Sequence, residues 1–345
     1  MNSGFWSVCF ELESMTSKFC KLTFFLFFYH VNVTQTQKQK RWNEYSAYIR
    51  KTFGERVQKI SVNTGLGCPN LDGNLSFDGC TYCNNSSFSP FYCKPDKSIR
   101  EQLTEGIDFF AKKYKSQKYL AYFQSYTNTY TSDTDFANMM NEALDTKGVV
   151  GLVVATRPDS ISETQIELLD TLAKSNYVNL EFGIESSLDR TLRRINRGHD
   201  AQSTINAFAA CKGKHFHTGA HLIFGLPGES ELEILSHADF INSLQPNSLK
   251  LHQLQVLKGT AIADEFKQVP EDFVNFTVDS YIELVIRFLE KLNPNIVMER
   301  FTSESPKIII ISPDWGGLKN FEFVETLRKQ MILHGNFQGK KFKIS

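Results

Sequence analysis

Three cysteine residues stand close together in segments that are rich in glycine. Cys80 and Cys83 form a Cys-x-x-Cys pair, and Cys68 precedes them in the sequence Gly-Leu-Gly-Cys-Pro-Asn. Thiolates are soft ligands for zinc, copper(I) and iron–sulfur clusters, and glycine lets the backbone approach a bound group closely. The pattern therefore predicts a metal centre held by Cys68, Cys80 and Cys83.

The number of thiols leaves two kinds of centre open. A structural zinc ion normally has four protein ligands, so zinc would require a histidine or Cys93 in addition to the three cysteines. A four-iron cluster held by three cysteines leaves one iron free to bind another molecule. Spacing alone does not decide between these two alternatives.

Net charge and the number of cysteines limit the partners and the compartment that we expect for this chain. The 345 residues include 38 Lys and Arg against 38 Asp and Glu, so no net charge attracts the chain to nucleic acid or to an anionic membrane. A local basic stripe at Lys112, Lys113, Lys115 and Lys118 is typical of a solvated helix face and, less often, of a nucleic-acid contact. The odd number of cysteines, seven, argues against a disulfide framework and favours a reducing compartment, the cytosol.

Residues 1–40 differ from the rest of the chain. The apolar run Lys21–Val31 is too short to span a bilayer. Glu11 and Glu13 precede it and no small-residue cleavage site follows, which argues against a signal peptide. We expect a disordered or non-native tail and no membrane association, with export as the alternative.

Apolar and β-branched runs alternate with helical periods from Val57 onward, as expected for βα units around a parallel sheet. The predicted strands are Val57–Val62, Tyr119–Phe123, Gly151–Ala155, Val178–Gly183, His217–Phe224 and Ser248–Val256. The predicted helices lie within Ile99–Tyr114, Asp135–Leu144, the segment capped by Ser162, Leu188–Ile195, Ala201–Lys212 and Glu231–Leu244. Further along, Phe273–Leu292 and Phe321–Leu333 are predicted as helices and Ile308–Ile311 as a buried strand.

The predicted fold class is α/β: a partial TIM-type (β/α)6 barrel over residues 41–302, with the irregular N-terminal tail and an α/β extension over 303–345. In such barrels the chemistry lies at the carboxyl ends of the strands. The loops at these ends are polar, and one after the fifth strand is Gly225-Leu-Pro-Gly-Glu229. One large ligand beside the metal centre would contact several of them.

Eight short segments together carry a resemblance to a known family: Arg41–Tyr45, Cys68–Gly73, Gly79–Asn84, Ala121–Tyr130, Thr156–Asp159, Leu192–His199, His221–Gly228 and Val256–Thr260. In these segments the chain resembles the radical S-adenosylmethionine (SAM) superfamily, in its elongator-like branch and the YhcC-like family. The spacing between Cys68 and Cys80 is longer than the Cys-x3-Cys-x2-Cys pattern common in the superfamily and is typical of the YhcC-like group.

The resemblance implies an enzyme with a [4Fe-4S] cluster on the three cysteines and SAM bound at the fourth iron. Reductive cleavage of SAM would give a 5′-deoxyadenosyl radical that abstracts a hydrogen atom from an unidentified substrate, with electrons from a donor such as flavodoxin or ferredoxin. The implied cofactor-binding residues are Tyr82, Gln124, Ser125, Thr127, Thr156, Arg157, Glu185, Arg197, His221 and Gly225. No catalytic side chain is identified.

Several alternatives accompany these expectations. The elongator-like resemblance suggests a tRNA or other nucleic-acid modifying enzyme, and the cysteine spacing allows a non-catalytic, zinc-stabilised binding module. Glu185 and Arg197 are expected at the SAM ribose and carboxylate, because a carboxylate accepts from hydroxyls and a guanidinium pairs with a carboxylate. The competing interpretation is a salt-bridge network that includes Glu181, Arg193 and Arg194 on a helix face.

Overall fold

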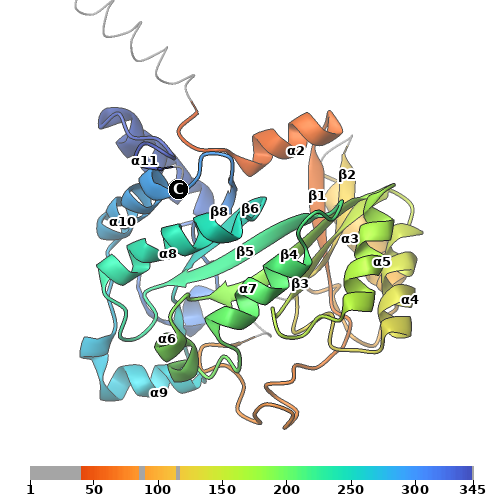
Figure 1. Ribbon diagram of the computed structural model, residues 1–345, viewed down its shortest axis with the longest axis horizontal. Helices are drawn as coiled ribbons and strands as arrows, with labels where there is room; N and C mark the ends of the chain where they lie inside the picture. Colours follow the sequence, from red (N-terminus) through yellow and green to blue (C-terminus); the bar gives the residue numbers. More distant parts are fainter. Residues whose placement is uncertain (1–39, 85–89, 114–116, 344–345) are drawn as a thin grey trace, which may run out of the picture.

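The computed structural model describes residues 40–84, 90–113 and 117–343. Its centre is a seven-stranded parallel sheet with the order β1-β2-β3-β4-β5-β6-β8 (Figure 1). The strands are β1 (Val57–Val62), β2 (Lys118–Phe123), β3 (Val149–Thr156), β4 (Tyr177–Glu185), β5 (His217–Phe224), β6 (Ser248–Gln253) and β8 (Val297–Arg300). The sheet is open, with β1 and β8 at its two edges, which confirms the α/β class and the partial barrel.

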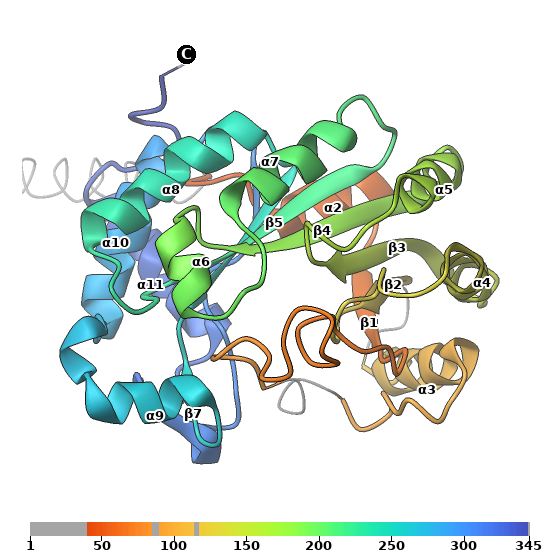
Figure 2. The same ribbon diagram turned by 60° about the horizontal axis from the view of Figure 1, so that its bottom comes forward.

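Helices cover the outer, convex face of this sheet, as the second view shows most clearly (Figure 2). Those between the strands are α3 (Ile99–Ala111), α4 (Asp133–Leu144), α5 (Glu163–Ala173), α6 (Asp189–Arg194), α7 (Ala201–Ala210) and α8 (Glu231–Leu244). Ser98, Ser162 and Ser230 cap α3, α5 and α8 in capping boxes, which satisfy backbone N–H groups that have no partner inside the helix.

Successive side chains along each strand point to opposite faces of the sheet. In β2, Ala121 and Phe123 belong to the main hydrophobic core, whereas Leu120 and Tyr122 belong to a separate small cluster together with residues of β3. In β6 the register places Lys250 beside His221 of β5. Polar side chains of several strands therefore gather on the concave face.

The C-terminal part adds three more helices and a second, small sheet. The helices are α9 (Ala261–Gln268), α10 (Val278–Lys291) and α11 (Asn320–Leu333), and the short strands β7 (Val256–Leu257) and β9 (Ile310–Ser312) pair in antiparallel fashion. Short 3₁₀ turns lie at Pro270–Asp272 and Lys307–Ile309. Phe323, Leu327 and Met331 of α11 are buried in the main core, so the C-terminal segment packs against the same core as the sheet.

Three predictions about the elements are corrected. The predicted strand Ser248–Val256 is interrupted after Gln253, and Val256 starts β7 in the second sheet. The sheet has a seventh strand, β8, because the chain returns to the edge of β6 after α10. The strand predicted as buried at Ile308–Ile311 begins later, at Ile310, with Ile308 in a 3₁₀ turn and 78% exposed.

Two helices were not predicted, α2 (Tyr45–Phe53) and α9. The N-terminal tail, apart from Lys40, lies outside the described residues. No helix among the described residues is both long and apolar enough to cross a membrane.

Candidate functional site

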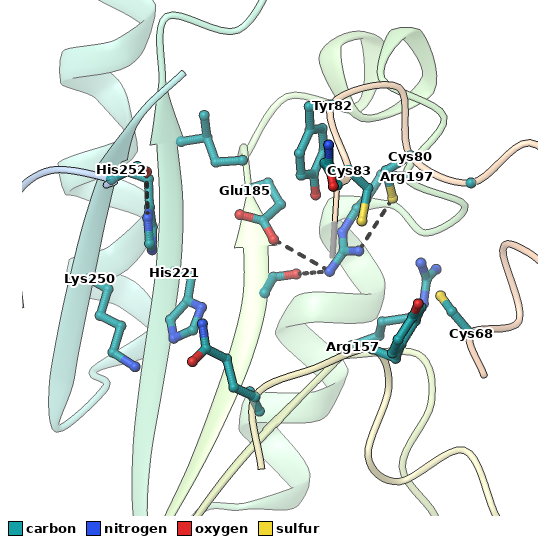
Figure 3. Close-up of a pocket in the computed structure, with 18 of the residues that line it drawn as sticks. Cys68, Cys80, Tyr82, Cys83, Arg157, Glu185, Arg197, His221, Lys250 and His252 are labelled. Carbon is teal, nitrogen blue, oxygen red and sulfur yellow. Dashed lines mark hydrogen bonds and ion pairs between the residues drawn. The ribbon is translucent and has the colours of Figure 1, made fainter. Parts of the chain in front are cut away.

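A pocket of about 260 Å³ opens at the carboxyl ends of the strands (Figure 3). Side chains from the cysteine loop and the strand ends β2 to β8 line it. On the cysteine side they are Cys68, Cys80, Tyr82, Cys83, Gln124, Thr127, Thr156, Arg157, Glu185 and Arg197. On the opposite side they are Tyr122, Lys250, His252, Gln253, Gln255, Arg300 and Ser303, and His221 lies between the two sides. The structure thus brings the three predicted metal ligands to one pocket.

Hydrogen bonds to two other parts of the chain hold the cysteine loop in place. Thr81 N donates to Ile195 O at 3.0 Å, and Thr81 O accepts from Ile262 N at 2.9 Å. Asn196 Nδ2 donates to Gly79 O at 2.7 Å. A loop without regular secondary structure is in this way fixed against the end of α6 and the start of α9.

Arg197 connects the cysteines to the end of β4. Its Nη1 lies 3.6 Å from Cys80 Sγ, and its Nη2 donates to Gly183 O at 2.7 Å and lies 3.6 Å from Glu185 Oε1 (Figure 3). Glu185 has a φ of 68°, a left-handed conformation that costs energy for a residue with a side chain and is often found at functional sites. Arg197 and Glu185 therefore form one unit beside Cys80.

Gly183 leaves the space that this unit occupies. A Cβ atom at Gly183 would lie 2.7 Å from both Arg197 Nη2 and Glu185 Oε1. Only glycine avoids this overlap at a strand position that faces the pocket.

Arg157 is a second buried guanidinium at the cysteine side. It forms a two-pronged ion pair with Asp159, Nε to Oδ1 at 2.9 Å and Nη2 to Oδ2 at 2.8 Å. Its Nη1 is buried without a hydrogen-bond partner among the described residues. Arg157 therefore keeps one N–H donor for a ligand. Thr156, also buried, forms a hydrogen bond through its hydroxyl to the hydroxyl of Thr129.

Two of the predicted cofactor-binding residues do not line the pocket. Ser125 is absent from its wall. Gly225, with a φ of 90°, borders a separate small cavity, and a Cβ there would lie 3.0 Å from the ring of Phe276. Cys93, the possible fourth ligand of a zinc ion, also lies elsewhere, where its thiol donates to Ser61 O at 2.9 Å.

The wall opposite the cysteines rests on a buried network of charges. Lys250 Nζ lies 2.5 Å from Glu181 Oε2 and 3.1 Å from Glu299 Oε1, and Lys59 Nζ lies 3.1 Å from Glu181 Oε1 and 2.6 Å from Glu299 Oε1. His221 Nε2 lies 3.1 Å from Glu181 Oε2. Two lysines and two carboxylates thus balance each other beneath the pocket.

Burial alone would raise the pKa of the Glu181 carboxyl, but the adjacent Lys250 and Lys59 hold that pKa well below its usual value. The Glu181 side chain between these two lysines is only 1% exposed. Glu181 is therefore a buried carboxylate that depends on its partners for its charge.

The structure corrects the salt-bridge network considered for Glu181. Glu181 lies on β4 and points to Lys59 and Lys250, whereas Arg194 pairs with Glu265 and Asp272. The basic stripe is corrected in part as well: Lys118 lies on β2, 3.4 Å from Glu55, and Lys115 lies outside the described residues.

Residues of the opposite wall were missed from the sequence. Lys250 and His252 alternate with Leu249 and Leu251 in β6, and polar residues at alternate positions of an apolar strand are a usable signal for an inward face. Arg300 is the last residue of β8, a strand that was not predicted, so nothing in the sequence placed it at the pocket.

Comparison with known proteins identifies the family. The model of the "Radical SAM superfamily" matches residues 62–241 and that of the "Radical_SAM C-terminal domain" matches residues 246–332. The uncharacterised protein MJ0486 of Methanocaldococcus jannaschii is 31% identical over 305 residues, 87% of this chain and 92% of that protein. Protein YhcC of Escherichia coli K12 is 30% identical over 280 residues, 81% of this chain and 89% of that protein.

A solved structure is similar in fold. It is the archaeal Elp3 of Methanocaldococcus infernus with an N-terminal deletion, with a TM-score of 0.57 and 19% sequence identity. The similarity covers 82% of this chain and 64% of that one.

Proposed function

The chain belongs to the radical SAM superfamily, and from this we propose that a [4Fe-4S] cluster on Cys68, Cys80 and Cys83 supplies the electron that cleaves SAM to a 5′-deoxyadenosyl radical for hydrogen abstraction from a substrate. Members of the superfamily are enzymes that use this cluster and SAM. The single observation that carries the proposal for these residues is that all three cysteines line one pocket with Arg197 and Glu185.

The residues around the cysteines fit such a cluster. Arg197 Nη1 at 3.6 Å and Asn70 Nδ2 at 3.5 Å both point to Cys80 Sγ, and N–H donors to the sulfurs of a cluster tune its charge and potential. No three His, Cys, Asp or Glu side chains among the described residues are grouped as ligands of a single ion.

The positions of the other polar groups support SAM as the ligand beside the cysteines. Arg197 Nε and Arg157 Nη1 are buried donors without partners among the described residues, and a carboxylate is a suitable acceptor for a guanidinium N–H. Glu185 offers acceptors for ribose hydroxyls. His221, Gln124, Thr127, Thr156 and Tyr82 line the same pocket, and we assign them to its cofactor-contacting wall.

Enclosure of the pocket would protect a radical from water and from stray hydrogen donors. Tyr82 is partly buried and packs against a hydrophobic cluster that includes Leu254 and Ile262. The chain's contribution is therefore to bind, orient and shield the reacting molecules, while the cofactors carry the redox chemistry.

The test is to reconstitute the protein anaerobically, add dithionite and SAM, and measure 5′-deoxyadenosine by chromatography. We expect its formation to depend on both the reductant and reconstituted iron. A colourless protein with one tightly bound zinc ion, and no 5′-deoxyadenosine, would contradict the proposal. In the cell we expect a flavodoxin or ferredoxin in a reducing compartment, the cytosol, to take the place of dithionite.

The substitution Gly183→Ala should weaken SAM binding by about tenfold to a hundredfold, because moving a charged group away from SAM would remove a hydrogen bond worth about 1.5–3 kcal/mol. The added methyl group would displace Arg197 or Glu185, each only 2.7 Å away. Equilibrium binding of SAM to the reconstituted protein measures the effect.

Gly213→Ala is the matched control for this prediction. Gly213 has a φ of 80° and open space around it, so alanine there should lower stability without changing SAM affinity. Unchanged SAM affinity in Gly183→Ala would show that the Arg197 and Glu185 pair does not contact SAM.

A further inference from the structure

The wall opposite the cysteines carries a positive charge that the proposed function does not use. Lys250 and His252 lie on β6 at the far side of the pocket from Cys68 and Cys80, with Glu185 and His221 between them (Figure 3). Arg300, at the end of β8, lines this same side. The wall is therefore separated from the guanidinium groups of Arg197 and Arg157 at the cysteine end.

Arg300 is the source of the excess charge. In the network below, two lysines, Lys59 and Lys250, face two carboxylates, Glu181 and Glu299, and their charges cancel. Arg300 is the register neighbour of Lys250, is exposed, and forms no ion pair or hydrogen bond within the described residues. One unpaired guanidinium thus faces the pocket.

The field in this corner is positive. Burial and then the charges of Arg300, His221 and Lys250 lower the pKa of His252 well below its usual value. Burial does not favour an anion, but the positive charges of Arg300 and Lys250 that disfavour a second proton on His252 would attract one. His252 is consequently a neutral imidazole beside a cation.

The polar groups of this corner are held in fixed positions. Ser303 N donates to Gln253 Oε1 at 2.6 Å, and Ser303 Oγ lies 2.9 Å from His252 Nδ1. Gln255 Nε2 donates to Ser303 O at 3.4 Å. The other end of this amide, Gln255 Oε1, is buried and has no hydrogen-bond partner among the described residues, so it can accept from a donor on a ligand.

We propose that Arg300, His252 and Gln255 form the subsite for a substrate that carries a carboxylate or phosphate group next to a hydroxyl or amino donor. The guanidinium of Arg300 pairs with the anion, and Gln255 Oε1 accepts from the donor. The inference rests on the proposed function, because it assigns this wall to the molecule that meets the radical and the cysteine wall to SAM. An acidic group held here fixes which end of the substrate faces the cofactor.

The experiment measures binding and does not depend on turnover. Two probes are titrated separately into the reconstituted protein and followed by calorimetry. One is inorganic phosphate, and the other is malate, which carries carboxylates beside a hydroxyl. We expect one of the probes to bind in about the millimolar range and Arg300→Gln to weaken that binding about tenfold, the effect of losing one charge-assisted contact. Arg300→Lys, which keeps the charge without the planar fork, should retain part of the affinity.

Arg287→Gln is the matched control. It removes the same charge from the exposed face of α10, where Arg287 pairs with Glu231, and should bind the probes as the wild type does. Equal binding by Arg300→Gln and wild type, or no binding of either probe, would overturn the subsite. Saturating SAM should leave probe binding intact, and displacement of the probe by SAM would assign the charge to the cofactor instead.

The two proposals can fail separately. Arg300-dependent binding of a probe without 5′-deoxyadenosine formation would contradict the radical function and leave an anion site. Formation of 5′-deoxyadenosine without Arg300-dependent binding would contradict the subsite alone. Which probe binds more tightly distinguishes a phosphate from a carboxylate substrate.

Discussion

Cys80→Ala should abolish both iron binding and 5′-deoxyadenosine formation. Loss of groups that only support a metal ligand already costs about 10- to 100-fold in affinity or activity, so loss of the ligand itself should cost more than about 100-fold. Cys68→Ala and Cys83→Ala should behave in the same way, because each thiolate of a three-cysteine cluster holds its own iron. Iron and sulfide content of the reconstituted variants, with deoxyadenosine in the same samples, gives the measurement.

Cys211→Ala is the control for these variants. Cys211 is a buried cysteine at the end of α7 and is not one of the residues that line the pocket. This variant should retain iron and activity with a modest loss of stability. If one of the three pocket variants keeps full iron and full activity, its cysteine is not a cluster ligand.

Glu181→Gln should have the second largest effect, a loss of about 3–5 kcal/mol in the free energy of unfolding. The side chain of Glu181 is 1% exposed and is the shared partner of Lys59 and Lys250. An amide keeps the shape but leaves two buried ammonium groups with only Glu299 to balance them. Urea unfolding at neutral pH measures the difference, and Glu283→Gln, on the exposed side of α10, is the control expected to stay close to wild type.

The pH dependence of the stability of wild type and Glu181→Gln tests whether the charge of Glu181 causes this loss. The pKa of Glu181 is lowered in the folded protein, since the attraction of Lys250 and Lys59 exceeds the effect of burial. A lowered carboxyl pKa stabilises the fold above the unfolded-state value, and this stabilisation disappears as the pH falls towards the folded-state value. The stability gap between wild type and Glu181→Gln should therefore shrink as the pH falls below about 4.5. A gap that is independent of pH would mean that packing, and not charge, causes the loss.

Most strands were predictable because their signal is local. The bounds of β1 and β5 agree with the sequence prediction, and α8 does as well. In each of these segments, the spacing of the apolar residues or the capping residues indicates the structure without reference to distant parts of the chain. The family motifs were equally readable, because they lie in short contiguous segments.

Elements that depend on distant partners were missed or misplaced. β8 is a short strand that exists because it pairs with β6, and it was missed. β7 was predicted as the end of a longer strand and β9 was predicted to begin at Ile308, whereas the two are short segments that pair with each other. Their residues carry no period long enough to be recognised. α9 is likewise fixed by tertiary contacts, since Ile262 N donates to Thr81 O in the cysteine loop.

The sequence by itself determined the three thiols, the order of the βα units and the family, because residue type and spacing along the chain carry that information. The tertiary structure decided which charges meet. Lys59, Glu181, Lys250 and Glu299 come from four strands, and their balance, with the unpaired Arg300 beside it, depends on strand register. Register is set by the packing of the whole sheet, and no local stretch of sequence contains it.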